Sequence, residues 1–447
     1  MRLPFFAEPL LEIIQALLQS DYTSIMRTLQ VTNFSCIKEA SIEVNRLTLI
    51  IGPQASGKSV LCKLNYFLIE CATNQYAHLF KQDSFEKFVD AIKVRFLEWF
   101  PQSAWGPGQF KICLTAGDFV VSLTRKKWGG KVSNDFRIKF SDEFKFQYEF
   151  LLKEASKVNS KTDSTRESDP FRLEYRFRDL ADDSLNKLMG KDYVGYQAFV
   201  PAGRSFFTSI GKAIAVFEHG RVLDPLILRF GRLYTTMKDR AYFPEKTQPP
   251  FRKLVEKTLD GLLGGRVEKD GDREYMHTTD GRKIPLSAMS SGQQELLPLI
   301  TFMPWLMRNT GERLCYIEEP EAHLFPAAQS TLIDTLVMAT NHTSQSSASS
   351  LIITTHSPYV LTKVNNLLKA GAISRKGSDD DRKKLETVVQ RRSWLQSRNV
   401  RAYAIKDGCV LNILESDGLI DSDYLDEVSG ELGKEFDRLL EVEHQIG

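Results

Sequence analysis

Eight consecutive residues in the first part of the chain have the pattern of a phosphate-binding loop. Their sequence, GPQASGKS, matches G-x-x-x-x-G-K-[ST] at every fixed position. In such a loop, backbone N–H groups and the N-terminus of the following helix surround phosphate oxygens. We expect Lys58 to bind the β- and γ-phosphates and Ser59 to ligate Mg²⁺. The predicted nucleotide-binding residues are Gly52, Pro53, Gln54, Ala55, Ser56, Gly57, Lys58 and Ser59.

A second segment places two carboxylates directly after an apolar run. Leu314–Ile317 is followed by Glu318 and Glu319, which is the Walker B pattern. Glu318 is predicted to be the carboxylate associated with the metal, and Glu319 the general base for an attacking water. The alternative is a solvated acidic strand end. It is less favoured, because adjacent carboxylates after a buried strand repel each other unless a cation is near.

A third segment, between these two, begins a predicted helix. Ser290, Ser291, Gly292 and Gln293 precede the apolar run Leu296–Ile300. Small residues let the backbone approach a phosphate, and the helix dipole then points at it. Read alone, the segment also fits an ordinary helix cap, since Ser with Glu a few residues later is a capping pattern.

The elements around these segments indicate an α/β fold. Apolar runs predict buried strands at 47–51, 313–317 and 351–355, and a helix follows the phosphate-binding loop. Further predictions are a helix at 85–100, β-structure at 109–150, helices at 151–190, a strand at 194–201 and a final helix at 422–443. The predicted domains are an N-terminal helical extension (1–25), an ATPase lobe with Walker A (26–150), a helical arm insertion (151–285), the part with the third segment and Walker B (286–368), and a charged insertion, hairpin and C-terminal helix (369–447).

Composition limits the classes of protein that fit. A chain of 447 residues, 42% of them hydrophobic, predicts two or three domains or one large domain with insertions. A net charge of +2 gives no global field that would attract nucleic acid. Six scattered cysteines without a CxxC pair indicate reduced thiols in a cytoplasmic protein. No apolar run reaches the ~18 residues of a membrane helix, and residues 1–25 predict an amphipathic helix and no signal peptide.

Together, these motifs resemble those of the ABC-type ATPases of the SMC/RecF group, in particular the stand-alone OLD and AAA15/AAA21 types. Four further segments fit the same group: the strand entry Asn33-Phe34, Phe199–Ser205, Leu425–Ser429 and Phe436–Glu441. The resemblance covers roughly residues 26–365 and the last part of the chain. It implies an ABC-ATPase head: a P-loop NTPase core with an antiparallel β subdomain and a helical arm. ATP and Mg²⁺ are the implied cofactors.

The resemblance also implies roles for individual residues. His356, in Thr354–Pro358, resembles the switch histidine that contacts the γ-phosphate, so Glu319 and His356 are the implied catalytic pair. Ser59 and Glu318 are the implied metal ligands. Ser290, Ser291, Gly292 and Gln293 resemble the signature that completes the site of a neighbouring copy, with Ser291 in place of the usual first glycine. Gln197 is a further candidate site residue, as the Q-loop glutamine that contacts magnesium or water. Arg204 is another candidate, either to reach phosphate or to support the site.

The implied function is an ATP-gated homodimer or higher homo-oligomer that controls a separately encoded nuclease or toxin. ATPase subunits of the Septu and PARIS anti-phage systems have this size and motif set. The sequence departs from chromosome-scale SMC proteins in having no long coiled coil, and it has no TOPRIM-like nuclease domain after His356. The alternative is a RecF-like DNA-repair ATPase that binds DNA through the basic stretches Arg125–Trp128 and Arg391–Trp394. A third reading is a nucleotide-dependent scaffold with negligible turnover.

Overall fold

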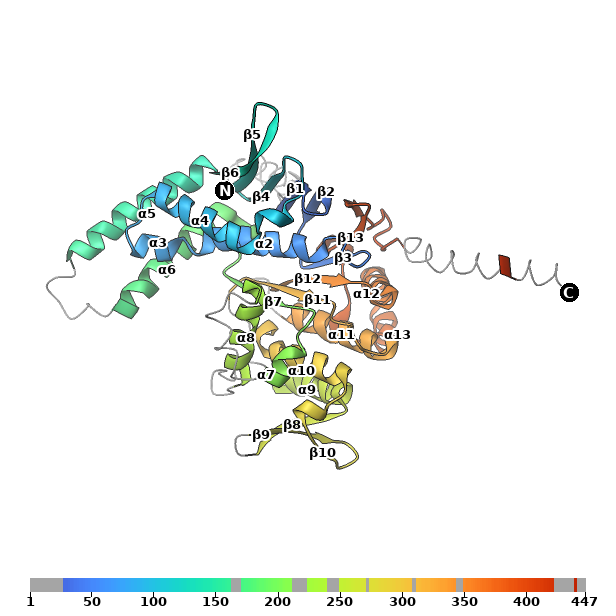
Figure 1. Cartoon of the computed structure of the whole chain (residues 1–447). Coiled ribbons are helices and arrows are strands. Elements are labelled where there is room, and N and C mark those ends of the chain that lie inside the picture. The colour runs from blue at the N-terminus through green and yellow to red at the C-terminus, as the bar shows by residue number, and fades with distance from the viewer. Residues whose placement is uncertain are drawn as a thin grey trace, which may run out of the picture.

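The computed structural model describes residues 27–161, 170–210, 223–238, 249–270, 273–307, 311–342, 349–421 and 438–439. A large twisted sheet runs through the middle of the molecule and has helices on both faces (Figure 1). A pair of long helices extends to one side, and a small three-stranded sheet lies at the opposite end from the β5–β6 hairpin. The predicted α/β fold class, with an antiparallel β subdomain and a helical arm, is confirmed.

In the described part of the chain, eleven strands form one sheet in the order β6-β5-β4-β1-β2-β14-β13-β3-β12-β11-β7, and three form a second in the order β10-β9-β8. The strands are β1 Thr28–Phe34, β2 Ile37–Glu43, β3 Leu47–Ile51, β4 Lys111–Ala116, β5 Phe119–Trp128, β6 Lys131–Phe140, β7 Tyr196–Val200, β8 Gly265–Asp270, β9 Arg273–Thr278, β10 Lys283–Pro285, β11 Arg313–Glu318, β12 Ser349–Thr355, β13 Val400–Lys406 and β14 Cys409–Asn412.

The helices alternate with these strands through the sequence. They are α2 Lys58–Thr73, α3 Gln75–Phe80, α4 Phe85–Trp99, α5 Asp142–Lys161, α6 Pro170–Met189, α7 Phe206–Ile210, α8 Pro225–Lys238, α9 Pro249–Leu263, α10 Ser291–Leu306, α11 Pro326–His342, α12 Pro358–Lys376 and α13 Asp379–Val388. Among the described helices, none has the length and hydropathy that a membrane crossing requires.

The parallel half of the sheet sets the position of the chemistry-bearing loops. β12 pairs in parallel with β3 on one side and with β11 on the other, so Thr355 aligns with Ile51 and Glu318 with Thr354. All five residues of β3 are buried, as expected for a strand covered on both faces. Because parallel strands end at the same edge, the segments that follow Ile51, Glu318 and Thr355 meet there.

The sheet separates two apolar clusters. Ile50, Tyr316 and Ile352 face the cluster that contains the core residues of α2 and α4. Their neighbours Ile51, Cys315 and Ile353 face the cluster that contains α10, α11 and α12. This alternation follows from the two-residue period of a strand. Helix α10 therefore lies on the opposite face of the sheet from α2 (Figure 1).

The antiparallel part of the sheet has an aromatic core. Phe34, buried in β1, packs edge-on against Phe100 and Phe110 at ring-centroid distances of 5.7 and 5.1 Å. Helix α4, predicted at residues 85–100, packs into this core through Phe88, Phe96 and Trp99. The arm consists of α5 and α6, which contact each other and α3. These contacts tie the arm to the helix layer that begins at the phosphate-binding loop.

Two predicted domain assignments need correction. Residues 151–285 are not one insertion, because β7 lies in the main sheet and pairs with β11. The hairpin predicted within residues 369–447 is β13–β14, but it is not separate from the core, because β13 pairs with β3 in the centre of the sheet and most of its residues are buried. Residues 1–25, and the final helix at 422–443 except for 438–439, lie outside the described residues.

Two glycines in helices predict opposite effects of the same substitution. A Cβ on Gly371, in α12, would lie 1.7 Å from the carbonyl oxygen of Leu395, so Gly371→Ala forces the backbone apart. We expect it to lower the free energy of unfolding by about 3 kcal/mol or more. A Cβ on Gly261, in α9, meets nothing within 4 Å. Gly261→Ala is expected to stabilise by about 0.5–1 kcal/mol. Urea unfolding midpoints measure both changes, and two shifts of the same sign would contradict this packing.

Candidate functional site

The phosphate-binding loop joins β3 to α2 through a backbone that requires glycine. Gly57 has φ 105° and is the N-cap of α2, and a Cβ there would lie 2.5 Å from Ile37 Cδ1. Ala55 is also left-handed, at φ 61°. The loop leads directly into the first turn of α2, whose free N–H groups can bind an anion. The sequence-predicted loop is thus followed directly by a helix N-terminus.

Lys58 turns back over the loop. It is only 5% exposed, and its ammonium donates to the carbonyl oxygens of Gly52 at 2.8 Å and Pro53 at 2.9 Å. The same nitrogen lies 3.2 Å from Nε2 of His356. Burial lowers the pKa of Lys58, while the charges of Glu319, Glu321 and Glu318 act in the opposite direction. Lys58 is a cation held where three carboxylates converge.

Glu318 is the last residue of β11 and is buried. Its Oε2 accepts from the N–H of Ala202 at 3.3 Å. Burial raises the pKa of Glu318, while the hydroxyl of Ser59 lies beside the carboxylate and acts to lower its pKa. Its Oε1 is buried with no hydrogen-bond partner. A hydroxyl beside an unsatisfied carboxylate oxygen is a donor set that suits Mg²⁺, so Ser59 and Glu318 fit the predicted metal ligands.

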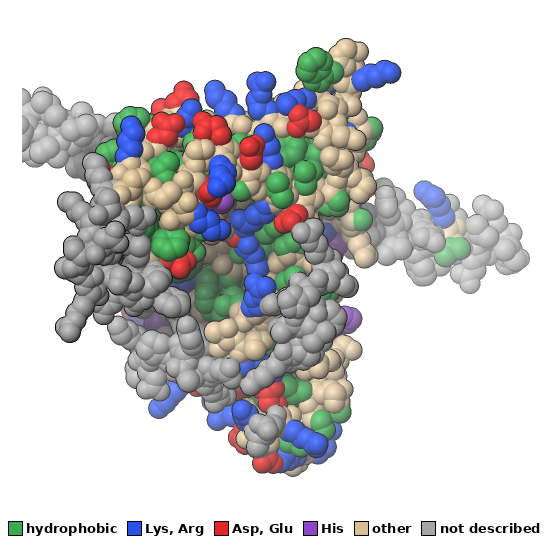
Figure 2. Space-filling model, turned by 60° about the vertical axis from the view of Figure 1, so that its left-hand side comes forward, with side chains coloured by type: hydrophobic (Ala, Val, Ile, Leu, Met, Phe, Trp, Pro, Cys, Tyr) green, Lys and Arg blue, Asp and Glu red, His purple; other side chains and the backbone are tan. Residues whose placement is uncertain are grey.

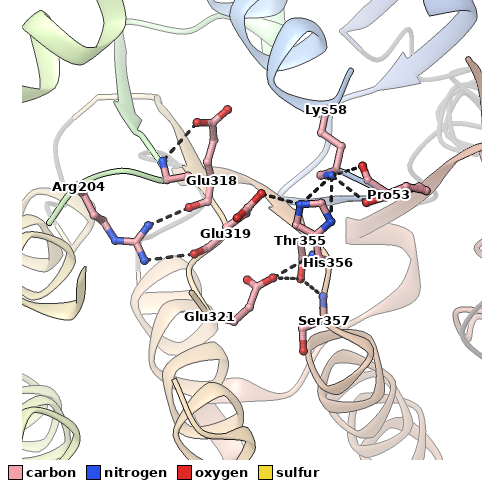
Figure 3. A network of polar contacts seen from close by, with 11 residues as sticks. Pro53, Lys58, Arg204, Glu318, Glu319, Glu321, Thr355, His356 and Ser357 are labelled. Atoms are coloured by element: carbon pink, nitrogen blue, oxygen red, sulfur yellow. Dashed lines mark hydrogen bonds and ion pairs between the residues drawn. The ribbon is translucent and has the colours of Figure 1, made fainter. Parts of the chain in front are cut away.

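Glu319 and His356 form the exposed side of the site. Oε1 of Glu319 lies 2.7 Å from Nε2 of His356, and both side chains are 34% exposed (Figure 3). Glu319 has φ 44°, a conformation uncommon outside glycine, and its N–H donates to the carbonyl of Thr354 at 2.9 Å. The hydrogen bond and the left-handed turn direct the carboxylate across the edge of the sheet. Lys58, His356 and Glu319 thus form a continuous row of polar contacts.

Glu321 is a site residue that the sequence interpretation did not assign. It is 8% exposed, and its Oε1 accepts from the hydroxyl of Thr355 and, at 3.0 Å, from the N–H of His356. It therefore fixes the backbone at the end of β12 (Figure 3). The only sequence signal was its place in the run Glu318–His323, which predicts an acidic loop but not a contact with β12.

Arg204 supports the backbone of the acidic loop that follows β11, and its side chain does not point toward the phosphate-binding loop. Its side chain is fully buried, and its guanidinium donates to the carbonyl oxygens of Glu318 at 2.9 Å and Glu319 at 3.2 Å. Of the two roles expected for it, support is the one this geometry fits.

Gln197 lies away from the site, and its prediction as a Q-loop glutamine is corrected. It pairs with Leu314, at the start of β11, whereas Glu318 ends that strand. Four residues of strand separate these positions by about 13 Å. The Gln197 side chain donates to the carbonyl of Tyr66 and accepts from the hydroxyl of Tyr316. The neighbouring residue that does reach Glu318 is Ala202, through its backbone.

The third segment begins α10 with a capping box. Ser290 accepts from the N–H of Gln293, whose side-chain oxygen accepts in return from the N–H of Ser290. The capping partner is Gln293 and not the glutamate of the sequence interpretation, since Glu295 is buried. Gly292 is required, because a Cβ there would lie 2.7 Å from the carbonyl oxygen of His323. Ser290 and Ser291 are exposed, and no described hydrogen bond joins 290–293 to 52–59.

Residues 234–361 match a protein-family model described as an AAA ATPase domain. The matched part contains α10, β11 and His356, and the phosphate-binding loop precedes it. No curated protein matches the sequence.

The solved structures that are similar to this protein include the following two. One is the SmcHead bound to the C-winged helix domain of ScpA, at 12% identity and TM-score 0.40, covering 87% of this protein and 97% of that one. The other is the SMC head domain from Thermotoga maritima, at 11% identity and TM-score 0.33, covering 87% and 98%.

Substitutions at Glu321 test the buried contact that positions His356. Glu321→Ala leaves two donors near β12 without an acceptor, and each buried unsatisfied group costs about 1–3 kcal/mol. We expect it to destabilise by about 2–4 kcal/mol, whereas Glu321→Gln retains an acceptor and costs less. Thermal and urea unfolding of the two variants measure the difference. Equal stability of Glu321→Ala and the unsubstituted protein would show that the contact contributes nothing.

Proposed function

We propose that this protein binds and hydrolyses ATP as an ABC-type ATPase. The observation that carries the proposal is the convergence of functional groups at one edge of the sheet. Lys58 lies beside His356, which contacts Glu319, while the hydroxyl of Ser59 lies beside Glu318. These side chains come from three loops that are far apart in the sequence. The match of residues 234–361 to an AAA ATPase domain supports the same activity.

The arrangement assigns a task to each group. The loop N–H groups and Lys58 bind the phosphates, and Lys58 exchanges the carbonyls of Gly52 and Pro53 for phosphate oxygens. Ser59 and Glu318 would hold Mg²⁺, which would neutralise charge on the phosphates. Glu319 accepts a proton as water attacks the γ-phosphorus, and the bond to the β-phosphate oxygen breaks to give ADP and phosphate. His356, positioned by Glu321, donates to the γ-phosphate.

We propose further that two copies enclose two ATP molecules, with the signature of one copy completing the site of the other. Helix α10 lies on the opposite face of the sheet from α2, and Ser290 and Ser291 are exposed at its N-terminus. The first N–H groups of such a helix favour a phosphate. The close approach of Gly292 to the carbonyl of His323 supports a signature held beside the acidic loop of its own protomer.

The sequence resemblance supports a finer proposal about biological role. ATP-dependent closing of this homo-oligomer regulates a separately encoded nuclease or toxin in cytoplasmic anti-phage defence. The dimer then acts as the sensor or gate, and the partner carries the destructive chemistry.

A specific surface favours direct DNA binding as a second candidate function. Trp128 is 78% exposed at the tip of the β5–β6 hairpin, where Gly129 and Gly130 form the turn. Among the described residues, the flanking Lys127 and Lys131 have no ion pair. The hairpin projects beyond the sheet in Figure 1, and hydrophobic and basic side chains stand together at the top of Figure 2. An exposed indole beside free cations suits stacking on unpaired bases.

Two residues of the predicted basic stretches, Arg125 and Trp394, do not belong to this surface. Arg125 is 7% exposed and donates to the carbonyl oxygens of Ser133, Gly106 and Gly108. The Nε1 of Trp394 donates to the carbonyl of Val389. Arg125 and Trp394 therefore support the local fold, and the DNA proposal rests on the hairpin tip.

Substitution of Glu319 tests the ATPase proposal. Glu319→Gln removes the base but retains the volume and the backbone turn, so we expect turnover to fall by about 10²-fold or more. ATP should then hold two copies together, since the closed state no longer decays through hydrolysis. Phosphate release and the ATP-dependent mass by light scattering measure the two effects. Asp380→Asn, on an exposed helix end, is the matched control. Normal turnover by Glu319→Gln would overturn the assignment of the base.

Substitution of Trp128 tests the DNA surface. Loss of stacking costs about 1–3 kcal/mol per base, so Trp128→Ala should weaken binding to single-stranded DNA by roughly 5- to 150-fold. Trp128→Phe should retain much of the affinity, and Tyr175→Ala, at an aromatic residue 66% exposed elsewhere, should retain all of it. Fluorescence anisotropy at several salt concentrations measures these changes. Equal affinities of Trp128→Ala and the unsubstituted protein would show that the hairpin tip does not bind DNA.

A further inference from the structure

Arg204 makes an unusual set of contacts for a side chain outside the reacting groups. Its guanidinium has five N–H donors, and each has a carbonyl acceptor. The acceptors and distances are Glu295 at 2.8 Å, Glu318 at 2.9 Å, Glu319 at 3.2 Å, Pro320 at 3.2 Å and Pro201 at 3.3 Å. The side chain has no exposed surface. A planar cation with every donor engaged holds these five backbone positions in one fixed arrangement.

The contacts of Arg204 belong to two different functional segments. Glu318, Glu319 and Pro320 form the acidic loop that ends β11, whereas Glu295 lies in α10. The carboxylate of Glu295 also forms an ion pair with Nε of Arg204, at 3.6 Å. Burial of a charge is costly unless it is paired and hydrogen-bonded. Neither the acidic loop nor α10 can therefore move away from Arg204 without leaving a buried charge partly unpaired.

Helix α10 carries this restraint to the signature. Glu295 lies five residues after Ser290, a distance of about 7.5 Å along the helix axis. A second contact joins the same two segments, because Gly292 lies against the carbonyl of His323, a left-handed residue at φ 60°. The acidic loop thus touches α10 at its first turn and, through Arg204, at its second.

We propose that Arg204 is a positioning residue that couples the two ATP sites of the dimer within each protomer. This inference rests on the proposed function, in which the acidic loop of a protomer serves its own ATP and the start of its α10 serves the ATP of its partner. A displacement of Glu319 when ATP binds then moves α10, and with it the contact made to the other ATP. Hydrolysis at one site changes the rate at the other by the same route.

A dimer with one active site separates coupling from local support. Two affinity tags allow isolation of a heterodimer in which one protomer, the blocked protomer, carries Glu319→Gln and the other, the active protomer, is unsubstituted. All turnover then occurs on the phosphate-binding loop of the active protomer, which receives the signature of the blocked protomer.

Adding Arg204→Lys to the blocked protomer changes no residue of the active protomer. It loosens the contacts of Arg204 with Pro201, the acidic loop and α10, all within the blocked protomer. We expect turnover in the active protomer to change by about 5-fold or more, a typical size for coupling between sites. Phosphate release from the two heterodimers, with and without Arg204→Lys, measures this change.

Two controls keep the result interpretable. Arg282→Lys in the blocked protomer alters an exposed arginine paired with Asp280 and should leave turnover in the active protomer unchanged. Hydrogen exchange gives a second measurement that needs no substitution of Arg204. In a protein with Ser291→Arg, which blocks the exposed start of α10 but keeps the cap at Ser290, ATP should alter the exchange of the amides at 291–296, although these residues lie on the opposite face of the sheet from α2.

The outcomes distinguish the coupling from the function on which it rests. Equal turnover of the active protomer with and without Arg204→Lys in its partner would overturn the coupling alone. Exchange at 291–296 that does not respond to ATP would overturn it as well. Absence of ATP turnover in the unsubstituted protein would overturn the proposed function and the coupling together.

Discussion

The parallel alignment of β3, β12 and β11 is the constraint on which the rest of this protein depends. It brings the residues after Ile51, Thr355 and Glu318 to one edge of the sheet, although they lie far apart in the sequence. Each of these strands is mostly apolar and covered on both faces. A shift in strand register would therefore expose buried side chains and also displace the functional loop that follows the strand. The site is therefore as well defined as the core beneath it.

Several charged side chains are buried at this edge of the sheet, and each needs a neighbour of opposite charge. Lys58 lies in the field of Glu318, Glu319 and Glu321. Arg204 forms an ion pair with Glu295 and has no exposed surface. Apart from the partly exposed Glu319, these groups are buried, and a buried charge without a partner costs several kcal/mol. The left-handed backbone of the acidic loop adds strain that the surrounding hydrogen bonds must hold. Such an arrangement favours a small number of defined positions for the acidic loop and α10.

The sequence predictions agree with the structure where they concern a short stretch of backbone. The phosphate-binding loop, the two carboxylates after β11 and the cap before α10 can be recognised from adjacent residues, because each depends on a short stretch of backbone. The interpretations of Gln197 and Arg204 depended on where their side chains point. Gln197 lies at the wrong end of its strand, and Arg204 points at carbonyl groups. Glu321 was left unassigned because its partners, Thr355 and His356, come from another strand.

The sequence by itself determined the α/β class, the position of the loop with the phosphate-binding pattern, and the order of the acidic, histidine and signature segments. These follow from hydrophobic periodicity and from residue types that permit only a few local conformations. Only the tertiary structure decided that β13 belongs to the centre of the sheet, that α10 lies on the face opposite α2, and that Arg204 joins the signature helix to the acidic loop. Those facts depend on strand pairing and side-chain direction between distant segments, which no local pattern encodes.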